Sequence, residues 1–358
     1  MDIKKKLHAG VIGCGFIAQT QWLYYLHELD EFEMAALCDA SKELVDYYGD
    51  YYGVKKRYTD WRLLLEDKEI DAVIVLTKCH EEICIAAAAN KKHVLVEKPL
   101  CENLEQACRI EEAVNTSGVI LMVGEMKRYD PGFQYAMQCF QNMKDIWMIR
   151  ARDFSDGLQR SYGQIYPVRF AADIPDEVKE KTAAEFEKGL RGVTKELPGN
   201  LYETLLMCGV HNIELMRASF GEPKKILHCD IWNEGETLSC EMDYGDKCRA
   251  FFEVGLTNYK WFDEEITVYG DEKAVTVRFP NPLLKNAVTE VIVKENSDGA
   301  VVEKRIEASY SEAFKNELIH FYQCVTEHKK PWTSIEEGKT DIKIMQEIFS
   351  SYAERIRG

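Results

Sequence analysis

A glycine-rich turn near the start of the chain has the residue types and spacing of a phosphate-binding loop. Gly13, Gly15 and Ala18 form the pattern G-x-G-x-x-A, directly after a short apolar run and at the start of a helical stretch. The first glycine permits a tight turn, the second lets the backbone approach a pyrophosphate, and the alanine keeps helix and strand close. The free N–H groups of the helix N-terminus favour the bound anion. The pattern predicts a dinucleotide site, against the alternative of a glycine turn that binds no ligand.

An acidic residue after the next apolar run indicates which dinucleotide is bound. Asp39 stands where a carboxylate can accept hydrogen bonds from the adenosine ribose hydroxyls. Because the same carboxylate repels a 2′-phosphate, we expect NAD. Ser41 and Lys42 leave NADP open as the less favoured cofactor.

A lysine ends the fourth apolar run, in the step Glu97-Lys98-Pro99. A side chain at the carboxyl end of a parallel strand points into the crevice where doubly wound folds bind ligands. An ammonium group there can stabilise a developing alkoxide or relay its proton. An isolated lysine is more often simply solvated, so the residue by itself leaves both interpretations open.

His211 is the second candidate for proton transfer. A neutral imidazole near pH 7 can take a hydroxyl proton while hydride leaves the same carbon for a nicotinamide. A lone histidine on a helix is more often a packed core residue. The helix is expected to begin with a capping box at Asn200 and Glu203 and to end at Gly221, and Gly209 inside it indicates a close approach by another group. Helical spacing would place four side chains on one face: Thr204, Met207, Cys208 and His211.

The elements that would position these residues fall into two patterns. Over the first part of the chain, short apolar runs alternate with helical stretches, which is typical of a doubly wound α/β domain with a parallel sheet. One helix is marked clearly by Asn103 and Gln106 as a capping box and by Gly118 as its stop. The runs are Ala9–Ile12, Met34–Cys38, Asp71–Leu76, His93–Val96 and Val119–Val123.

After residue 130 the pattern changes to strands that alternate polar and apolar residues, followed by two amphipathic helices over 311–328 and 336–355. Such alternation is typical of an antiparallel sheet with one covered face. We therefore predict a Rossmann-type α/β domain over 1–130 and an α+β domain over 131–358, whose final helices pack back on the first. The expected strands are 147–154, 226–232, 238–244, 249–256, 265–269, 274–279, 288–293 and 301–306.

Composition excludes several classes of partner. The 358 residues hold 45 Lys and Arg against 61 Asp and Glu, for a net charge of −16. A surface of that sign repels nucleic acid and anionic lipid. The 12 cysteines fall singly and without zinc spacing, so we expect no metal site and a protein of the reducing cytoplasm.

These motifs together resemble the Gfo/Idh/MocA oxidoreductases, which include glucose–fructose oxidoreductase and inositol dehydrogenase. The resemblance rests on the turn 13–18, His80, the stretch 93–100 with its Glu-Lys-Pro step, and 118–131; 314–321, Pro331 and the closing helix are similar too. It is weakest over 155–198. It implies a Rossmann domain, a second domain with a large open, mostly antiparallel sheet, and an active site between them. The outer face of that sheet would join a homo-oligomer, a dimer, tetramer or hexamer.

The resemblance also implies roles for single residues. Lys98 would reach the nicotinamide and the reacting hydroxyl, and His211 would be the catalytic histidine. Beside Gly13, Gly15, Ala18 and Asp39, the cofactor would contact Phe16, Ile17, Thr77, His80, Glu97 and Lys98. The substrate would contact Lys98, His211, Asn212 and Arg128, together with Arg160, Tyr162 and Tyr166 of the aromatic loop 155–170, whose rings suit stacking on a sugar unless the loop packs on its own domain.

One position departs from the family pattern. Many members have an aspartate four residues before the histidine, and Met207 stands there in this chain. A thioether can neither accept a proton nor orient an imidazole. Either His211 works with Lys98 alone, or Tyr202 or Glu203 replaces the aspartate, or dehydrogenase chemistry is impaired. Glu125, Lys127 and Arg128 follow the fifth run and serve either in salt bridges or in substrate contacts.

The expected function is NAD-dependent oxidation of a secondary hydroxyl of a sugar, inositol or glycoside. The 3-position of a glucoside is favoured because the aromatic loop leaves room for an aglycone. Two alternatives stay open: a glycosidase that oxidises transiently and eliminates on one bound NAD, and an NAD(P)-sensing regulator without catalysis. Met207 favours the regulator, whereas Lys98 and His211 speak against it.

Overall fold

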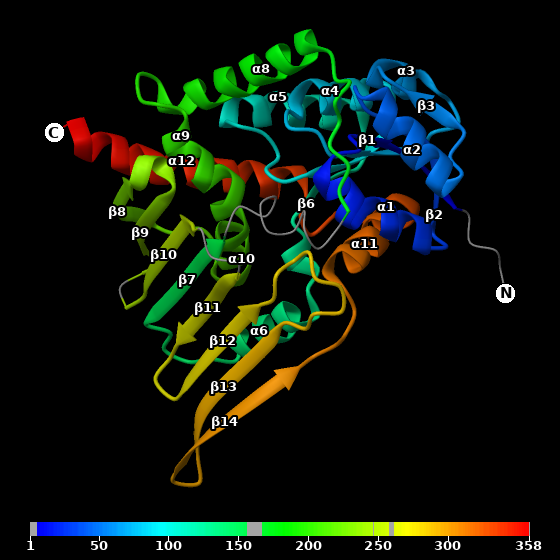
Figure 1. The fold of residues 1–358 in the computed structure, drawn as a ribbon. Helices are drawn as coiled ribbons and strands as arrows, with labels where there is room; N and C mark the ends of the chain where they lie inside the picture. Colours follow the sequence, from blue (N-terminus) through cyan, green and yellow to red (C-terminus); the bar gives the residue numbers. More distant parts are fainter. Residues whose placement is uncertain (1–5, 156–166, 246, 258–260, 358) are drawn as a thin grey trace. The chain divides into compact units, whose positions relative to one another are not determined.

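A computed structural model describes residues 6–155, 167–245, 247–257 and 261–357 (Figure 1). The chain forms two compact units, each assembled from separate stretches. Unit 1 comprises Met1–Gly124, Gly163–Gly189 and Phe314–Ile342, and unit 2 comprises Glu125–Tyr162, Leu190–Ala313 and Lys343–Gly358. The predicted division after residue 130 into domains stays a prediction, because compactness does not show that a stretch folds alone.

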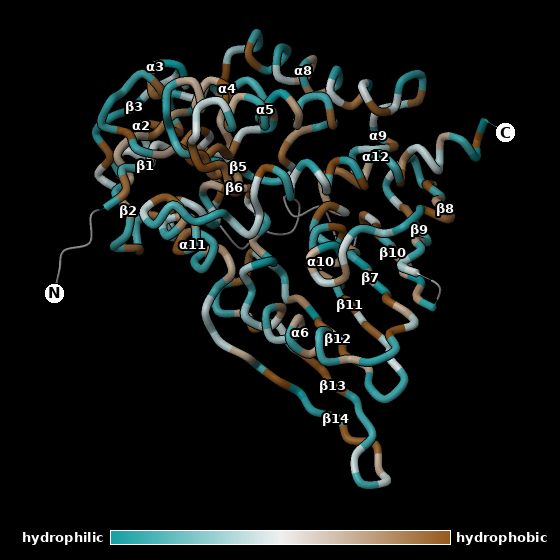
Figure 2. Tube along the Cα trace, turned by 180° about the vertical axis from the view of Figure 1, so that it is seen from behind, coloured by the Kyte–Doolittle hydropathy of each residue, from teal (hydrophilic) through white to brown (hydrophobic). Residues whose placement is uncertain are grey.

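Unit 1 is built on a six-stranded sheet in which all strands are parallel, in the order β3-β2-β1-β4-β5-β6. This is the Rossmann order, and it confirms the predicted fold class. Figure 2 shows why the strands lie inside, since apolar residues gather where β5 and β6 run. The strands are β1 Leu7–Ile12, β2 Phe32–Cys38, β3 Lys56–Tyr58, β4 Ala72–Val75, β5 His93–Glu97 and β6 Leu121–Gly124. Strand β3 was not predicted, because its three residues carry no apolar pattern.

Helices connect these strands, and one shows how local sequence determines its ends. Helix α5 has the predicted capping box, in which Asn103 and Gln106 satisfy each other's backbone N–H groups, and it ends at Gly118 with φ of 70°. The helices of unit 1 are η1 Ala18–Trp22, α1 Leu23–Glu28, α2 Lys42–Tyr52, α3 Trp61–Glu66, α4 Glu81–Ala89, α5 Leu104–Ser117 and α11 Ala313–Glu327, while α8 Asp176–Thr194 and α12 Ile335–Arg357 begin here and end in unit 2.

Unit 2 is built on an eight-stranded sheet in the order β14-β13-β12-β11-β7-β10-β9-β8, in which only the pair β7 and β10 is parallel. The predicted antiparallel sheet is confirmed. Helix α6 packs on β12 and β13, and α10 packs on β7. The strands are β7 Met148–Ser155, β8 Lys225–Trp232, β9 Thr237–Asp243, β10 Arg249–Leu256, β11 Asp263–Tyr269, β12 Lys273–Phe279, β13 Glu290–Ser297 and β14 Ala300–Glu307, and the helices are η2 Met126–Tyr129, α6 Pro131–Gln141, α9 Asn200–Thr204, η3 Leu205–Gly209, α10 Val210–Phe220 and η4 Asn233–Gly235.

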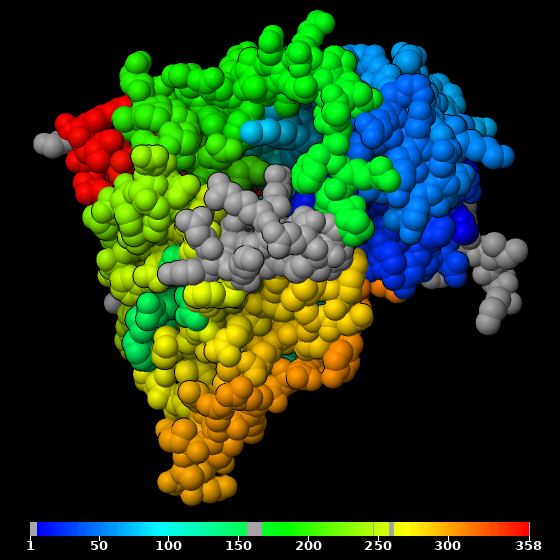
Figure 3. Space-filling model, viewed as in Figure 1, coloured from blue at the N-terminus to red at the C-terminus, as the bar shows by residue number. Residues whose placement is uncertain are grey.

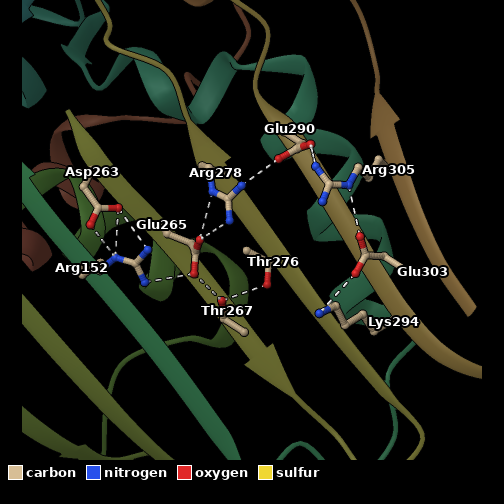
Figure 4. A network of polar contacts seen from close by, with 10 residues as sticks. All are labelled: Arg152, Asp263, Glu265, Thr267, Thr276, Arg278, Glu290, Lys294, Glu303 and Arg305. Atoms are coloured by element: carbon tan, nitrogen blue, oxygen red, sulfur yellow. Dashed lines mark hydrogen bonds and ion pairs between the residues drawn. The ribbon is translucent and has the colours of Figure 1, made fainter. Parts of the chain in front are cut away.

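A ladder of ion pairs covers part of this sheet, across β7, β11, β12, β13 and β14 (Figure 4). Arg278 lies in its middle, 3.1 Å from a Glu265 oxygen and 3.0 Å from a Glu290 oxygen. Arg152 pairs with Asp263 at 3.0 Å in the same ladder. The charges on this face are thus balanced by neighbouring strands.

The helical stretch before His211 differs from the prediction at its start. Asn200 is the first residue of α9 and makes no capping box; Gly199 is the N-cap, and the Asn200 amide donates to the carbonyl of Glu234. The stop at Gly221 is confirmed, with φ of 81°. None of the helices in the described ranges is long and apolar enough to cross a membrane.

Candidate functional site

The glycine turn of unit 1 has the geometry that the motif predicts. Gly13 has φ of +104°, and a Cβ there would come within 2.9 Å of the Leu76 carbonyl group, so only glycine fits. At Gly15, by contrast, a Cβ would meet no atom within 4 Å. The backbone at Gly15 therefore faces open space, as it must if a pyrophosphate is to lie against it. Phe16 and Ile17 continue the chain into η1 and are partly exposed.

Asp39 is tied to this turn. Its Oδ2 accepts a hydrogen bond from the Cys14 N–H at 2.7 Å, and its Oδ1 accepts one from the Ser41 N–H at 2.8 Å. Burial raises the pKa of Asp39, and these two N–H groups act against that rise. A carboxylate has about four acceptor positions. Asp39 therefore keeps acceptor capacity for ribose hydroxyls, and the turn and Asp39 together fit an NAD cofactor.

Lys98 follows strand β5, and its neighbours are held firmly. Buried Glu97 accepts a hydrogen bond from the Trp22 indole at 2.7 Å, and the Lys98 N–H donates to its other oxygen at 3.1 Å. Burial raises the pKa of Glu97. The Lys98–Pro99 peptide bond is cis. Glu97 thus fixes the strand end that carries Lys98, while its predicted contact with the cofactor stays a prediction.

His80 and Thr77 shape the loop after strand β4. The His80 ring nitrogens lie 2.9 Å from the Pro99 carbonyl and 2.8 Å from the Thr77 carbonyl. Burial lowers the pKa of His80, although two carbonyl neighbours favour the protonated ring. The Thr77 hydroxyl donates to the Cys79 carbonyl at 2.9 Å. Since both nitrogens of His80 face main-chain carbonyls, this side chain joins the β4 loop to the step at Pro99.

His211 in unit 2 has a carboxylate partner. Its Nδ1 lies 3.0 Å from Oε2 of Glu125, and the two side chains are 14% and 3% exposed. Glu125 directly follows strand β6. A carboxylate at this distance holds the proton on Nδ1 and makes Nε2 the acceptor nitrogen of the ring, as the carboxylate of a catalytic triad does. Glu125 therefore stands in the place for which Tyr202 and Glu203 were the expected replacements of the missing aspartate.

The helical stretch before His211 is not a regular α-helix throughout. Residues Leu205–Gly209 form a π-helical turn, so the spacing of an ordinary helix does not apply there, and the predicted shared face stays a prediction. Tyr202 is fully buried, with its ring 5.5 Å from that of Phe349. The close approach expected at Gly209 is confirmed, since a Cβ would come within 3.1 Å of the Phe252 ring.

The basic residues after β6 form ion pairs inside unit 2. Lys127 pairs with Glu264, and both side chains are almost completely buried. Asn212, also buried, donates to the other Glu264 oxygen at 3.3 Å. Arg128 lies 3.6 Å from Glu214. These contacts give Lys127, Arg128 and Asn212 structural partners, and the substrate contacts of Arg128 and Asn212 stay predictions.

Three predicted substrate residues, Arg160, Tyr162 and Tyr166, lie outside the described residues. Within the described ranges, no group of three or more His, Cys, Asp or Glu side chains could hold a metal ion. All 12 cysteines are free thiols. The contact of Glu125 with His211 was not predicted. A carboxylate at the end of a buried strand indicates a site, but the sequence does not show which side chain it contacts.

Comparison with known proteins agrees with the glycine turn and the strand order. Residues 7–125 match a family model described as an oxidoreductase family with an NAD-binding Rossmann fold. This part of the chain is therefore similar to the NAD-binding Rossmann domain of that oxidoreductase family. Over residues 7–125 this match confirms the resemblance to the Gfo/Idh/MocA oxidoreductases and the expected NAD cofactor.

Two relatives show how far sequence similarity extends. Myo-inositol 2-dehydrogenase of Thermotoga maritima is 36% identical over 138 residues, which are 38% of this chain and 41% of that enzyme. The match thus spans about two fifths of that relative. Scyllo-inositol 2-dehydrogenase (NAD(+)) of Bacillus subtilis is 24% identical over 345 residues, which are 92% of this chain and 89% of that enzyme.

Solved structures share the fold over the whole length. KijD10, a 3-ketoreductase from Actinomadura kijaniata in complex with NADP and TDP-benzene, has a TM-score of 0.76 at 17% identity and covers 97% of this chain and 98% of its own. Aldose-aldose oxidoreductase from Caulobacter crescentus has a TM-score of 0.77 at 16% identity, covering 98% of each chain. At these identities the likeness concerns the fold alone.

Proposed function

We propose that this protein is an NAD-dependent dehydrogenase of a secondary hydroxyl group in a sugar, inositol or glycoside. The observation that carries the proposal is the pair of His211 and Glu125, a histidine oriented by a buried carboxylate at 3.0 Å. The Rossmann unit with its open glycine turn supports the nicotinamide cofactor. A relative that aligns over nearly the full chain is an inositol dehydrogenase, which supports a polyhydroxylated substrate.

The residues of the chain divide the proton chemistry between them. The glycine turn and Asp39 would hold NAD, which would supply the hydride acceptor for the carbon that carries the hydroxyl. Glu125 accepts the Nδ1–H of His211, so that Nε2 can take the hydroxyl proton as a general base. The carboxylate also stabilises the imidazolium that results. Lys98 stabilises the negative charge that develops on the oxygen.

The finer proposal is oxidation at the 3-position of a glucoside. It is supported by the composition of the loop 155–170, whose aromatic residues suit a sugar with an aglycone. We also propose that the protein is a homo-oligomer joined through the sheet of unit 2. Its ladder of ion pairs (Figure 4) places both signs of charge on one face, and such a face can meet a rotated copy of itself.

Two alternatives make different predictions. A glycosidase that oxidises, eliminates and re-reduces on one NAD would give no lasting change in nicotinamide absorbance. The non-catalytic regulator loses its main support, because Glu125 supplies the carboxylate that Met207 does not.

The test is to incubate the purified protein with NAD and a panel of sugars, inositols and glycosides. Absorbance at the NADH band and mass spectrometry of the products would be followed together. A product lighter by two hydrogens supports the dehydrogenase, whereas cleavage without net NADH supports the glycosidase. Lys98→Ala is the control, expected to bind NAD and to turn over nothing. Absence of turnover by the wild-type protein on every compound, with NAD bound, would contradict the proposal and favour the regulator.

A further inference from the structure

A segment from the middle stretch of unit 1 is joined to the glycine turn through Gln19. Residues 167–175, which we call the strap, run into helix α8 and pass over the N-terminal part of the unit; Figure 3 shows them in green against blue. Gln19 holds the strap at one end. Its amide accepts from the Arg169 N–H at 2.8 Å and donates to the Arg169 carbonyl at 3.0 Å.

Gln19 joins the strap to the glycine turn itself. The same amide nitrogen donates to the Cys14 carbonyl at 2.8 Å, and its oxygen accepts from the Tyr48 hydroxyl at 2.7 Å. The Arg169 guanidinium lies over the Tyr47 ring, 3.6 Å from its centre. The strap is therefore anchored both to the turn and to helix α2.

The other end of the strap is held at the N-terminus of helix α2. The Asp173 carboxylate accepts from the Ser41 hydroxyl with one oxygen and from the Glu43 N–H at 2.9 Å with the other. These bonds lower the pKa of Asp173, chiefly through Ser41, so the group is an anion at neutral pH. The helix terminus thus already binds an anion, and that anion belongs to the chain.

This position matters because of what precedes it. Asp39, which fits the ribose, is followed closely by Ser41 and the start of α2. In dinucleotide-binding folds a 2′-phosphate is accommodated beside the acidic residue at the end of the second strand. The donors that a phosphate would need here are a hydroxyl and free helix N–H groups. Asp173 occupies these donors and adds a second negative charge near Asp39.

We propose that Asp173 is a specificity-determining residue that excludes the 2′-phosphate of NADP. The preference for NAD then depends on a residue far from Asp39 in sequence. Ser41 cannot donate to a 2′-phosphate, because its hydroxyl already donates to Asp173. The inference rests on the cofactor site of the proposed function and needs no substrate.

The test is to titrate NAD and NADP separately into wild-type protein and into Asp173→Ala, following heat or tryptophan fluorescence. Without the Asp173 carboxylate, the Ser41 hydroxyl and the Glu43 N–H can donate charge-assisted hydrogen bonds to the 2′-phosphate instead. We therefore expect the Kd for NADP to fall about tenfold, while the Kd for NAD changes less than threefold. Asp176→Ala is the matched control. It removes one exposed acid three residues along, paired only with Lys179 among the described ion pairs, and should leave both Kd values unchanged.

A second variant tests whether the gain passes through the vacated donors. Adding Ser41→Ala to Asp173→Ala should reverse most of the gain in NADP affinity. The proposal is overturned if Asp173→Ala keeps the wild-type ratio of the two Kd values, or if it weakens both cofactors equally. An unchanged ratio in an enzyme that still oxidises sugars overturns this inference alone, whereas a wild-type protein that binds neither dinucleotide overturns the proposed function with it.

Discussion

Glu125→Gln tests whether the carboxylate after strand β6 directs His211. The substitution preserves size and removes charge from a partner that is 3% exposed and 3.0 Å from Nδ1. A hydrogen bond to a charged group contributes about 1.5–3 kcal/mol, and 1.36 kcal/mol is a factor of ten in rate. If the pair strengthens only as the imidazolium forms, kcat should fall by about 10- to 150-fold.

The tautomer can enlarge this loss. The glutamine amide can turn its NH₂ toward Nδ1, which moves the ring proton to Nε2 and leaves no base for the hydroxyl. The corresponding change in a serine protease triad lowers kcat by about 10⁴. The expected range for Glu125→Gln is therefore about 10- to 10⁴-fold, with the upper end marking the wrong tautomer.

The assay has two readouts. Initial rates of NADH formation on the substrate found in the panel give kcat, and titration gives the Kd for NAD, which should stay within twofold. Nitrogen NMR of the labelled imidazoles reports the tautomer, and the His211 signals should show a proton on Nδ1 in the wild type. Glu203→Gln is the control, since it removes a carboxylate from the same helical stretch and leaves the pair of Glu125 and His211 in place.

The reasoning is refuted if Glu125→Gln keeps kcat within threefold of wild type and the tautomer of His211 does not change. An equal loss in Glu203→Gln would also count against it, because the effect would then follow charge and not the contact at Nδ1.

Three further predictions concern other parts of the structure. Gly15→Ala should leave the melting temperature within about 1 °C, because its Cβ enters open space, and should weaken NAD binding at least about tenfold, because the pyrophosphate is expected in that space. Gly13→Ala should destabilise the fold by about 1–2 kcal/mol or more, since its φ is positive and its Cβ would meet Leu76. Equal melting temperatures for the two variants would contradict this. Burial raises the pKa of Glu102 from 4.5 to about 7, so the folded state keeps a proton that the unfolded state loses. The free energy of unfolding should therefore fall by up to about 3 kcal/mol as pH rises from 4.5 to 7. Glu102→Gln should flatten this part of a profile of melting temperature against pH, and an unaltered slope would show that other groups cause it. Lys127→Met removes the cation beside the buried Glu264 carboxylate and should cost about 3–5 kcal/mol in urea unfolding. The double variant with Glu264→Gln should recover much of this loss; no recovery would mean that packing, not charge, is lost.

Features that depend on neighbours along the chain could be predicted from sequence. The ends of helix α5 follow from Asn103, Gln106 and Gly118, because capping involves residues within one turn. The alternation of apolar and polar residues predicted the strands of unit 2, since side chains of a strand alternate between its faces. The turn at Gly13 could also be predicted from local sequence, because glycine is the residue that adopts a positive φ most readily.

Features that join distant stretches could not be predicted. The partner of His211 is Glu125, 86 positions away, and local spacing pointed instead to residues near 207. The π-helical turn at Leu205–Gly209 changes the ordinary helical spacing there, and no local sequence pattern predicted that turn. Asp173 of the strap accepts a hydrogen bond from Ser41, although the two residues are 132 positions apart in the sequence. Only the tertiary fold brings them together.

The sequence by itself determined a dinucleotide-binding Rossmann fold, a second sheet and the identity of Lys98 and His211 as candidates for chemistry, because these depend on residue type and local pattern. The tertiary structure decided which carboxylate orients the histidine and which one occupies the N-terminus of α2. Those assignments depend on distances of about 3 Å between residues far apart in the chain, and hydrogen bonds act only at such distances.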